Sequence, residues 1–381
     1  MDELTYLIWL HLNHAVSTAC KVALLDYFGS PSAVYMAEKK DYIESGLLTN
    51  HAILSLLNKN VKSAKSEIAN AFDKGISIVG YRMPGYPSAL YDLHDPPIAL
   101  YVMGDRTVLQ HKAVFCMVGS RHASVYGMSA SLGVAEQLSR CGMSIVCGFA
   151  VGIDTAAHRG AIRGGGKTIA VLGCGIDMNY PAENAKLKDS IIENGAIISE
   201  FPLGTPPYGT NFPIRNRILS GLSLGVAVME AGERSGALIT AKCALEQGKD
   251  VFALPGNISN PLSSGTNKLI QEGAALLSGA DEILSEYILR YPSYFEIQDL
   301  IEEKNEEPDV PDLIADQSLS LQSAGLTEEE RAVYCVLSKE KMSFEEICKK
   351  TGLSAAELNT RLTLLQIKGK LREHPGLFFS R

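Results

Sequence analysis

Residues 113–154 read AVFCMVGSRHASVYGMSASLGVAEQLSRCGMSIVCGFAVGID, and this stretch decides the fold of the chain. A short apolar run, Ala113 to Val118, ends at a glycine turn and is followed by apolar residues at helical spacing. A second apolar run, Met143 to Cys147, ends at a second glycine turn. This order predicts the strand, helix and strand of one βαβ unit, with both turns at the same edge of a parallel sheet.

A cation stands in the first of these turns, which reads Gly119-Ser120-Arg121. Parallel strands bind ligands at their carboxyl ends, in the crevice between such turns. The backbone N–H groups and the dipole of the helix that follows favour an anion there. The sequence therefore predicts a phosphate-bearing ligand over residues 119–121.

Strand and helix patterns alternate without a break along residues 113–290, after two further predicted strands in residues 76–106. The apolar runs begin near Ala113, Met143, Thr168, Ala196, Leu224, Asp250 and Ala274. Regular alternation at this spacing indicates βαβ units, a mostly parallel sheet and helices on both faces. We therefore predict an α/β domain with an extended Rossmann-like sheet over residues 76–290.

Smaller segments flank this domain. Residues 1–75 have the pattern of short helices with tight turns, typical of a SAM-like or helix-hairpin-helix-like domain. Residues 291–324 are acidic and weakly periodic, which indicates a linker. Residues 325–381 predict a winged helix, because three capping boxes precede two short strand patterns around a His-Pro-Gly turn. The capping boxes are Thr327-x-x-Glu330, Ser343-x-x-Glu346 and Ser354-x-x-Glu357.

The composition suits a globular protein with a full core, since 46% of the 381 residues are hydrophobic and 20% are charged. No apolar run approaches the ~20 residues that span a membrane, so we expect no membrane segment. The eight cysteines form no C-x-x-C pair and suit reduced thiols in a cytoplasmic protein, so we expect no metal site. Gly173-Cys174-Gly175 resembles the start of a dinucleotide fingerprint, but Met178 stands where the third glycine is needed, so we expect no cofactor. Of the net charge of −8, −6 falls on residues 302–316, so a local basic groove remains possible elsewhere.

Cations gather near the predicted strand ends. Arg121, Arg215, Arg217 and Lys242 follow strands, whereas Lys167 precedes one and is expected at the opposite edge of the sheet. If residues 215 and 217 lie on the first turn of a helix, both side chains can face the sheet edge. An extended phosphate backbone needs several cations along one groove, whereas a mononucleotide needs one or two.

The sequence contains no recognisable catalytic constellation. The histidines are isolated, and no Ser or Cys nucleophile elbow accompanies them. Residues 164–168 resemble the end of a P-loop, but Ala161 stands where its first glycine is needed. We therefore expect a binding protein rather than an enzyme.

A series of motifs resembles those of the DNA-processing protein A family (DprA, also called Smf), densely over residues 76–290. The motifs are Tyr86-Pro87, Asp95-Pro96-Pro97, Gly119-Ser120-Arg121, Tyr126-Gly127, Gly148-x-Ala150-x-Gly152-Ile153-Asp154, Ala157-His158, Thr168 to Gly173, Asp177-x-x-Tyr180-Pro181, Ser199-Glu200, Phe212-Pro213-x-Arg215-Asn216-Arg217, Ser235-Gly236-Ala237-Leu238-Ile239-Thr240-Ala241 and Pro255-Gly256. The helical N-terminus and the winged-helix C-terminus also fit this family.

The resemblance implies a non-catalytic single-stranded DNA-binding protein that protects incoming strands during natural transformation and loads the RecA recombinase onto them. It also implies a homodimer formed through the Rossmann domain. Family DNA contacts correspond here to Arg121, Arg215, Arg217 and Lys242, with Lys167 a weaker candidate. The candidate nucleic-acid-binding residues are Gly119, Ser120, Arg121, Lys167, Asn211, Arg215, Asn216, Arg217, Ser235, Thr240 and Lys242.

Two other functions stay open at this point. Rossmann-like phosphoribohydrolases hydrolyse nucleotides with a Pro-Gly-Gly-x-Gly-Thr loop and a glutamate. Residues 235–240 stand in the comparable place, with Glu230 and Glu233 nearby. The other is a transcription regulator acting through residues 325–381, although ten Lys and Arg against eight Asp and Glu make a weak basic footprint there.

Overall fold

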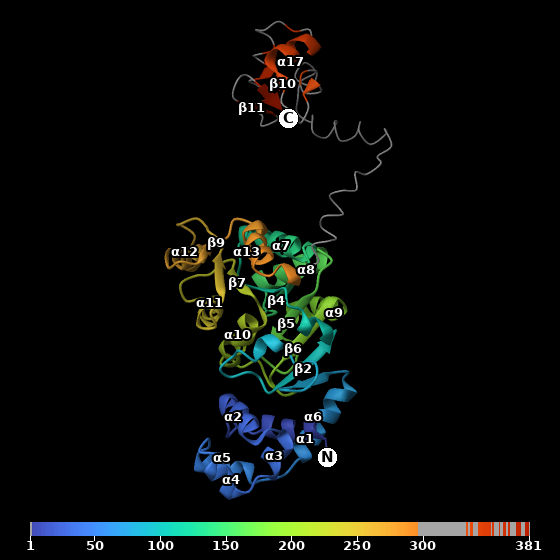
Figure 1. Ribbon diagram of the computed structural model, residues 1–381, viewed down its shortest axis with the longest axis vertical. Helices are drawn as coiled ribbons and strands as arrows, with labels where there is room; N and C mark the ends of the chain where they lie inside the picture. The colour runs from blue at the N-terminus through green and yellow to red at the C-terminus, as the bar shows by residue number, and fades with distance from the viewer. Residues whose placement is uncertain are drawn as a thin grey trace. The chain divides into compact units, whose positions relative to one another are not determined.

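The computed structural model of the protein describes residues 2–295 and, beyond them, residues 333, 336–337, 342–351, 353, 358, 361–362, 365, 371–374 and 378–380. The chain divides into two compact units, Met1–Leu300 and Ile301–Arg381 (Figure 1). Among the described residues, no helix combines the length and the apolar character needed to cross a membrane.

Nine strands of the first unit form one sheet in the order β1-β2-β6-β5-β4-β3-β7-β8-β9. The strands are β1 Ser77–Gly80, β2 Ala99–Gly104, β3 Val114–Val118, β4 Ser144–Cys147, β5 Thr168–Leu172, β6 Gly195–Ser199, β7 Gly225–Val228, β8 Asp250–Ala253 and β9 Ala275–Leu276. β2 pairs antiparallel with β1 and β6, and the other neighbours pair parallel. The predicted extended, mostly parallel sheet is therefore confirmed.

Helices cover both faces of this sheet because its central strands are apolar on both sides. All five residues of β3 are buried, and its alternate side chains enter different cores. Val114, Cys116 and Val118 belong to the core under α10 (Asn211–Leu222) and α11 (Ala237–Glu246). Phe115 and Met117 belong to the core under α7 (Val125–Arg140), α8 (Ile153–Arg163) and α13 (Ala280–Arg290). Two further helices are α9 (Ala185–Asn194) and α12 (Ser264–Gln271).

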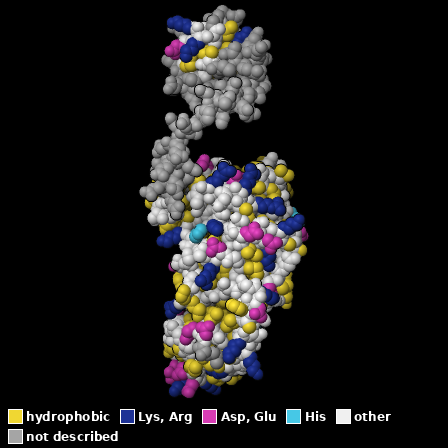
Figure 2. All heavy atoms as spheres, turned by 90° about the vertical axis from the view of Figure 1, so that its right-hand side faces the viewer, with side chains coloured by type: hydrophobic (Ala, Val, Ile, Leu, Met, Phe, Trp, Pro, Cys, Tyr) yellow, Lys and Arg dark blue, Asp and Glu magenta, His cyan; other side chains and the backbone are white. Residues whose placement is uncertain are grey.

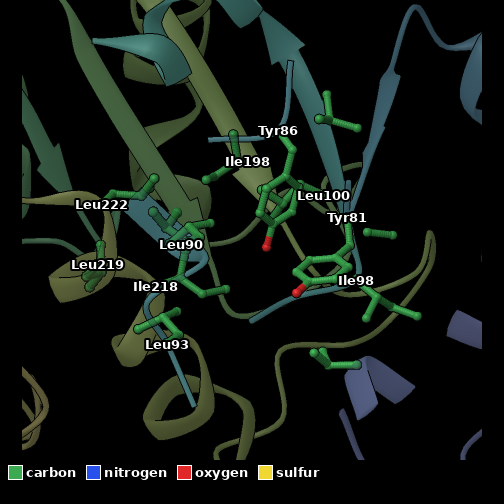
Figure 3. Packing of buried hydrophobic residues seen from close by; sticks show 14 of the residues in the cluster. Tyr81, Tyr86, Leu90, Leu93, Ile98, Leu100, Ile198, Ile218, Leu219 and Leu222 are labelled. Carbon is green, nitrogen blue, oxygen red and sulfur yellow. The ribbon is translucent and has the colours of Figure 1, made fainter. Parts of the chain in front are cut away.

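Apolar packing fixes α10 to its face of the sheet (Figure 3). Ile218, Leu219 and Leu222 share a buried cluster with Leu90 and with Ile198 of β6. Because α10 follows β6 in the chain, this packing leaves the amino end of α10 at the carboxyl edge of the sheet.

Six helices form the N-terminal region, as predicted for residues 1–75. They are α1 Glu3–His11, α2 Thr18–Phe28, α3 Pro31–Met36, α4 Lys39–Glu44, α5 Asn50–Leu56 and α6 Lys62–Asp73. Ser17, Ser30 and Thr49 cap α2, α3 and α5 through side-chain hydrogen bonds. Leu7 and Ile8 of α1 share one buried core with the sheet domain. The helices and the sheet thus form one compact unit, and a domain boundary near residue 75 stays a prediction.

The described residues of the second unit include the second of the three predicted helices and both predicted strands, together with a short strand, β10, that was not predicted. These elements are β10 Met342–Ser343, α17 Phe344–Thr351, β11 Arg372–His374 and β12 Phe378–Ser380. β12 pairs antiparallel with both other strands. The predicted capping box is present, because the N–H of Ser343 donates to Glu346 at 3.0 Å and the N–H of Glu346 donates to Ser343 at 3.3 Å. The capping boxes at 327–330 and 354–357, and residues 296–324 of the predicted linker, lie outside the described residues.

Candidate functional site

A pocket of about 450 Å³ lies at the carboxyl ends of β3 and β7. These two strands are neighbours, but β3 leads through α7 to β4 on one side and β7 leads through α11 to β8 on the other. Such a switch point leaves the crevice in which open α/β sheets bind their ligands. The residues that line it are Val118, Gly119, Ser120, Arg121, Ala150, Asp154, Phe212, Pro213, Arg215, Asn216, Leu219, Gly232, Arg234, Ser235, Gly236, Ala237, Ile239 and Thr240.

Backbone hydrogen bonds tie the loops of this pocket together. The N–H of Ser120 donates to the carbonyl of Glu230 at 2.8 Å, which joins the loop after β3 to the end of β7. The N–H of Ile153 donates to the carbonyl of Ser120 at 3.2 Å, which joins the loop after β4. Gly152 has φ of +83°, and a Cβ there would collide with the Ser120 carbonyl, so the close approach of these two loops requires glycine.

Glu230 holds the start of α7. It is 1% exposed, and its carboxylate accepts the N–H of Ser124 at 2.8 Å and the hydroxyl of Ser124 at 2.5 Å. The Ser124 hydroxyl in turn accepts the N–H of Gly127 and caps α7. Glu233, the other glutamate considered for hydrolysis, is exposed and does not line the pocket.

Arg215 reaches the floor of the pocket from α10, and the residue is only 5% exposed. Its guanidinium donates to the carbonyl of Gly148 at 2.9 Å and to the carbonyl of Val171. Asp154 of α8 lines the same floor, and its carboxylate accepts the N–H of Ala150 at 3.1 Å. Burial raises the pKa of Asp154 to about 6, although the charge of Arg215 opposes the rise. The carboxyl group is therefore ionised at neutral pH.

Aromatic rings lie beside the arginines. The guanidinium carbons of Arg121 and Arg215 lie 5.2 Å and 5.9 Å from the centre of the Phe212 ring. The Tyr180 ring lies 5.8 Å from the Phe212 ring. These four side chains line a smaller recess of about 40 Å³ next to the pocket. The edge of the sheet thus combines cations with aromatic faces.

Helix N-termini add positive potential to the pocket. The first turns of α10 and α11 contribute lining residues, and their N-cap residues, Thr210 and Gly236, form no side-chain cap. The dipoles of both helices therefore point their positive ends at the same place as Arg121, Arg215 and Arg234. This arrangement suits a phosphate group or another anion.

The structure brings most of the predicted site residues together. Those that line the pocket are Gly119, Ser120, Arg121, Arg215, Asn216, Ser235 and Thr240. Lys167 lies before β5, at the opposite edge as expected, with its ammonium 3.7 Å from Asp105. Lys242 projects from the exposed side of α11, 3.7 Å from Glu246. Asn211 is buried at the start of α10 and does not line the pocket.

Arg217 does not line the pocket, which corrects the expectation that it shares the sheet edge with Arg215. Its guanidinium donates to the carboxylate of Glu200 at 2.6 Å and lies 3.0 Å from the carboxylate of Asp95. The reason is helical geometry. Both arginines lie beyond the first turn of α10, and residues two apart on a helix point ~200° away from each other.

Arg234 and Asp154 line the pocket without being predicted. Arg234 does have a signal in the sequence, because it stands in the glycine turn after β7 as Arg121 stands in the turn after β3. Asp154 stands in the family motif of residues 148–154, but that motif does not mark it as part of an anion site, for which cations and hydrogen-bond donors are the expected groups. Its place is visible only once the loops are folded together.

Known sequences match over most of this chain. Residues 77–288 match the family described as DNA recombination-mediator protein A, and residues 317–376 match the DprA winged helix domain. The chain is 39% identical to Protein Smf of Escherichia coli over 292 residues, which is 76% of this chain and 74% of that protein. It is 37% identical to DNA processing protein DprA of Bacillus subtilis over 280 residues, which is 70% of this chain and 94% of that protein.

Solved structures agree with the sequence matches. DNA processing protein A from Streptococcus pneumoniae matches with a TM-score of 0.67 and 35% identity, over 75% of this chain and 99% of that one. DNA processing protein A from Helicobacter pylori, described for its mode of single-stranded DNA binding, matches with a TM-score of 0.52 and 30% identity, over 57% of this chain and 97% of that one. Together with the matched winged helix domain, these findings confirm the predicted fold class and family resemblance.

Proposed function

This chain belongs to the DNA recombination-mediator protein A family, and we propose that it binds single-stranded DNA in the pocket at the carboxyl ends of β3 and β7. The observation that carries the proposal is the cluster of Arg121, Arg215 and Arg234 around the first turns of α10 and α11. Guanidinium groups and helix N-termini both bind phosphate oxygens. The Helicobacter pylori relative, described as binding single-stranded DNA, supports the same ligand.

The face drawn in Figure 2 carries no broad basic patch over its described residues. Figure 2 shows Lys and Arg side chains interspersed with Asp and Glu over the face that it presents. With a net charge of −8, the chain as a whole does not attract a polyanion. Binding therefore depends on the arginines of the pocket and on Tyr180 and Phe212, whose rings offer faces on which bases stack.

The site binds without catalysis in this proposal. Both carboxylate oxygens of Glu230 accept hydrogen bonds from Ser124 at the start of α7, and Glu230 does not line the pocket, which supports a structural role for this glutamate. Asp154 is the carboxylate among the lining residues, and it is buried and bonded to the N–H of Ala150. Hydrolysis of a nucleotide is the competing function, and the experiment below distinguishes the two.

We further propose a role in natural transformation, in which the protein protects incoming strands in the cytoplasm and loads RecA onto them, as the family resemblance implies. A homodimer through the Rossmann-like domain fits the free edge of the sheet. β9 ends the strand order, and its Leu276 is 49% exposed. Exposed apolar side chains at the end of a sheet are suited to packing against a second copy of the chain.

Fluorescence anisotropy with a labelled single strand, its duplex and a free nucleotide, across a salt series, tests the proposal. We expect the protein to prefer the single strand. The slope of log affinity against log salt should be about −2, because each phosphate that one of the three arginines neutralises contributes about −0.7. Arg121→Glu should weaken binding at least tenfold, or about 1.4 kcal/mol, and reduce the slope by about 0.7. Lys40→Glu, the same charge change on an exposed side chain of α4, is the control and should alter neither quantity.

Lys242→Glu shows whether the strand continues along α11 beyond the pocket, as the family resemblance implies. Unchanged affinity in Arg121→Glu would exclude the pocket as the DNA site. Binding of the nucleotide alone, with release of its base, would establish the hydrolase instead.

A further inference from the structure

The N-terminal helical region holds the segment that connects β6 to α10. Glu67 of α6 accepts the backbone N–H of Leu203 at 2.8 Å. Lys74, at the end of α6, pairs with Asp177 at 2.5 Å, and Asp177 accepts the backbone N–H of Gly204 at 2.8 Å. The helical region thus fixes two consecutive N–H groups of the connecting segment. Glu67 binds the first directly, and Lys74 holds the second through its salt bridge to Asp177.

Glu200 opens the same segment and bonds to α10 itself. Its carboxylate accepts a hydrogen bond from Arg217 at 2.6 Å, and both side chains are 10% exposed. Arg217 also pairs with Asp95 at 3.0 Å. Lys21 of α2 is buried close by, and the negative charge of Glu200 opposes the fall in its pKa that burial causes. The Lys21 ammonium donates to the carbonyl of His11 at 2.6 Å, so the helical region places a cation near this cluster of charges without an ion pair to it.

These contacts bear on the pocket because α10 carries part of it. Phe212 and Arg215 stand on the same helix as Arg217, so any shift of α10 moves both. Apolar packing of Ile218 and Leu219 holds the helix on the sheet, but such packing has little directional preference. A binding site needs its groups held within about 0.5 Å, and hydrogen-bonded partners behind them supply that restraint.

We propose that the N-terminal helical region positions α10 for DNA binding, with Glu67 and Arg217 as positioning residues that do not touch the DNA. The inference rests on the proposed binding of single-stranded DNA in the pocket. It gives Arg217 a role different from the direct DNA contact that the family resemblance implies.

Three variants of the full chain separate these roles. Glu67→Ala removes the acceptor of the Leu203 N–H, and alanine favours the helix in which it stands. Arg217→Lys keeps the charge but loses the planar fork that reaches both Glu200 and Asp95, whereas Arg217→Gln loses the charge as well.

Asp250→Asn is the matched control, because Asp250 pairs with Arg290 and accepts the hydroxyl of Tyr287 at the opposite edge of the sheet. All variants are compared at a temperature where each is fully folded. The control should bind the labelled strand as the wild type does.

We expect Glu67→Ala and Arg217→Lys each to weaken single-strand binding about 5- to 20-fold, with an unchanged salt slope. The double variant should lose less than the product of the two effects, because both residues act through one segment. Arg217→Gln should also keep the wild-type slope, which a residue that neutralises a phosphate cannot do.

Wild-type affinity in Glu67→Ala would overturn the inference. The inference would also be overturned if Arg217→Gln reduced the salt slope by about 0.7 while Arg217→Lys kept near-normal affinity. That pair of results would indicate a direct contact between Arg217 and a phosphate. Equal weakening in Asp250→Asn would attribute the losses to general destabilisation and overturn it as well. If the wild-type protein does not bind the single strand, the proposed function itself fails, and this inference fails with it.

Discussion

Asp154→Asn should stabilise the protein at neutral pH, although it removes a charge partner of Arg215. The Asp154 carboxyl group is buried, and burial raises its pKa from 3.8 to about 6. The folded protein therefore holds this proton more tightly than the unfolded chain does. The free energy of unfolding therefore decreases as the pH rises from about 4 to about 6, and above pH 6 the fold has lost the whole contribution of this group.

The size of the effect follows from the pKa difference. One pKa unit corresponds to about 1.4 kcal/mol, so a shift of about two units costs about 3 kcal/mol once the group is ionised. Asparagine cannot ionise, and its side-chain oxygen can still accept the N–H of Ala150. The variant should therefore gain up to about 3 kcal/mol at pH 7.5, and its advantage should disappear below about pH 4.

Urea unfolding at pH 7.5 and pH 3.5, followed by circular dichroism, measures this difference for the unit of residues 1–300. Asp105→Asn is a control of opposite sign, because hydrogen bonds from Thr107 hold the pKa of Asp105 below its usual range. A loss of stability in Asp154→Asn at pH 7.5 would refute the reasoning, since the attraction of Arg215 would then outweigh burial. A gain of equal size at both pH values would refute it too, because ionisation would not be its cause.

Two further substitutions test the frame and the aromatic edge of the pocket. Gly152→Ala should destabilise the protein by more than about 3 kcal/mol, because strain at φ +83° adds to the collision with the loop after β3. Gly165→Ala is the control, because Gly165 has φ of +75° but a Cβ there would meet no atom within 4 Å, so this variant should lose only about 1 kcal/mol. Thermal unfolding compares the stability of the two variants. Similar losses in both would mean that the loops are not held in contact. Phe212→Ala should weaken single-strand binding by about 1–3 kcal/mol in anisotropy with no change in salt slope, because it removes stacking and no charge. A reduced slope would instead mean that the ring acts by holding Arg121.

Local signals account for the parts of the fold that the sequence predicts. The run from Ala113 to Val118 is short, entirely apolar and followed by a glycine turn, which favours a strand covered on both faces, and β3 is the strand next to β7 at the switch point. The capping box of Ser343 and Glu346 involves residues three apart and forms as predicted. Periodicity and capping are properties of neighbours in the chain, so both are readable before folding.

The site could be predicted only in part, because its residues are sorted by partners far away in the chain. Arg215 and Arg217 are the same residue type two positions apart, yet one lines the pocket and the other is in an ion-pair cluster. The Asp95 partner of Arg217 stands 122 residues earlier, and the contact of Glu67 with Leu203 spans 136 residues. Helical geometry shows that the two arginines diverge, but only the fold shows which side faces the pocket.

Burial divides the pocket arginines into two kinds with different uses. Arg215 is bonded to the carbonyls of Gly148 and Val171, so it links α10 to the ends of β4 and β5 and adds fixed positive potential. Arg121 is exposed at the rim, where a side chain can adjust to a phosphate. Replacing Arg215 therefore disturbs the loops and the binding together, and its effect on affinity cannot be assigned to DNA contact alone. Asp154 offsets part of the Arg215 charge, but burying its carboxylate costs more than this attraction returns, which is why Asp154→Asn is expected to gain stability.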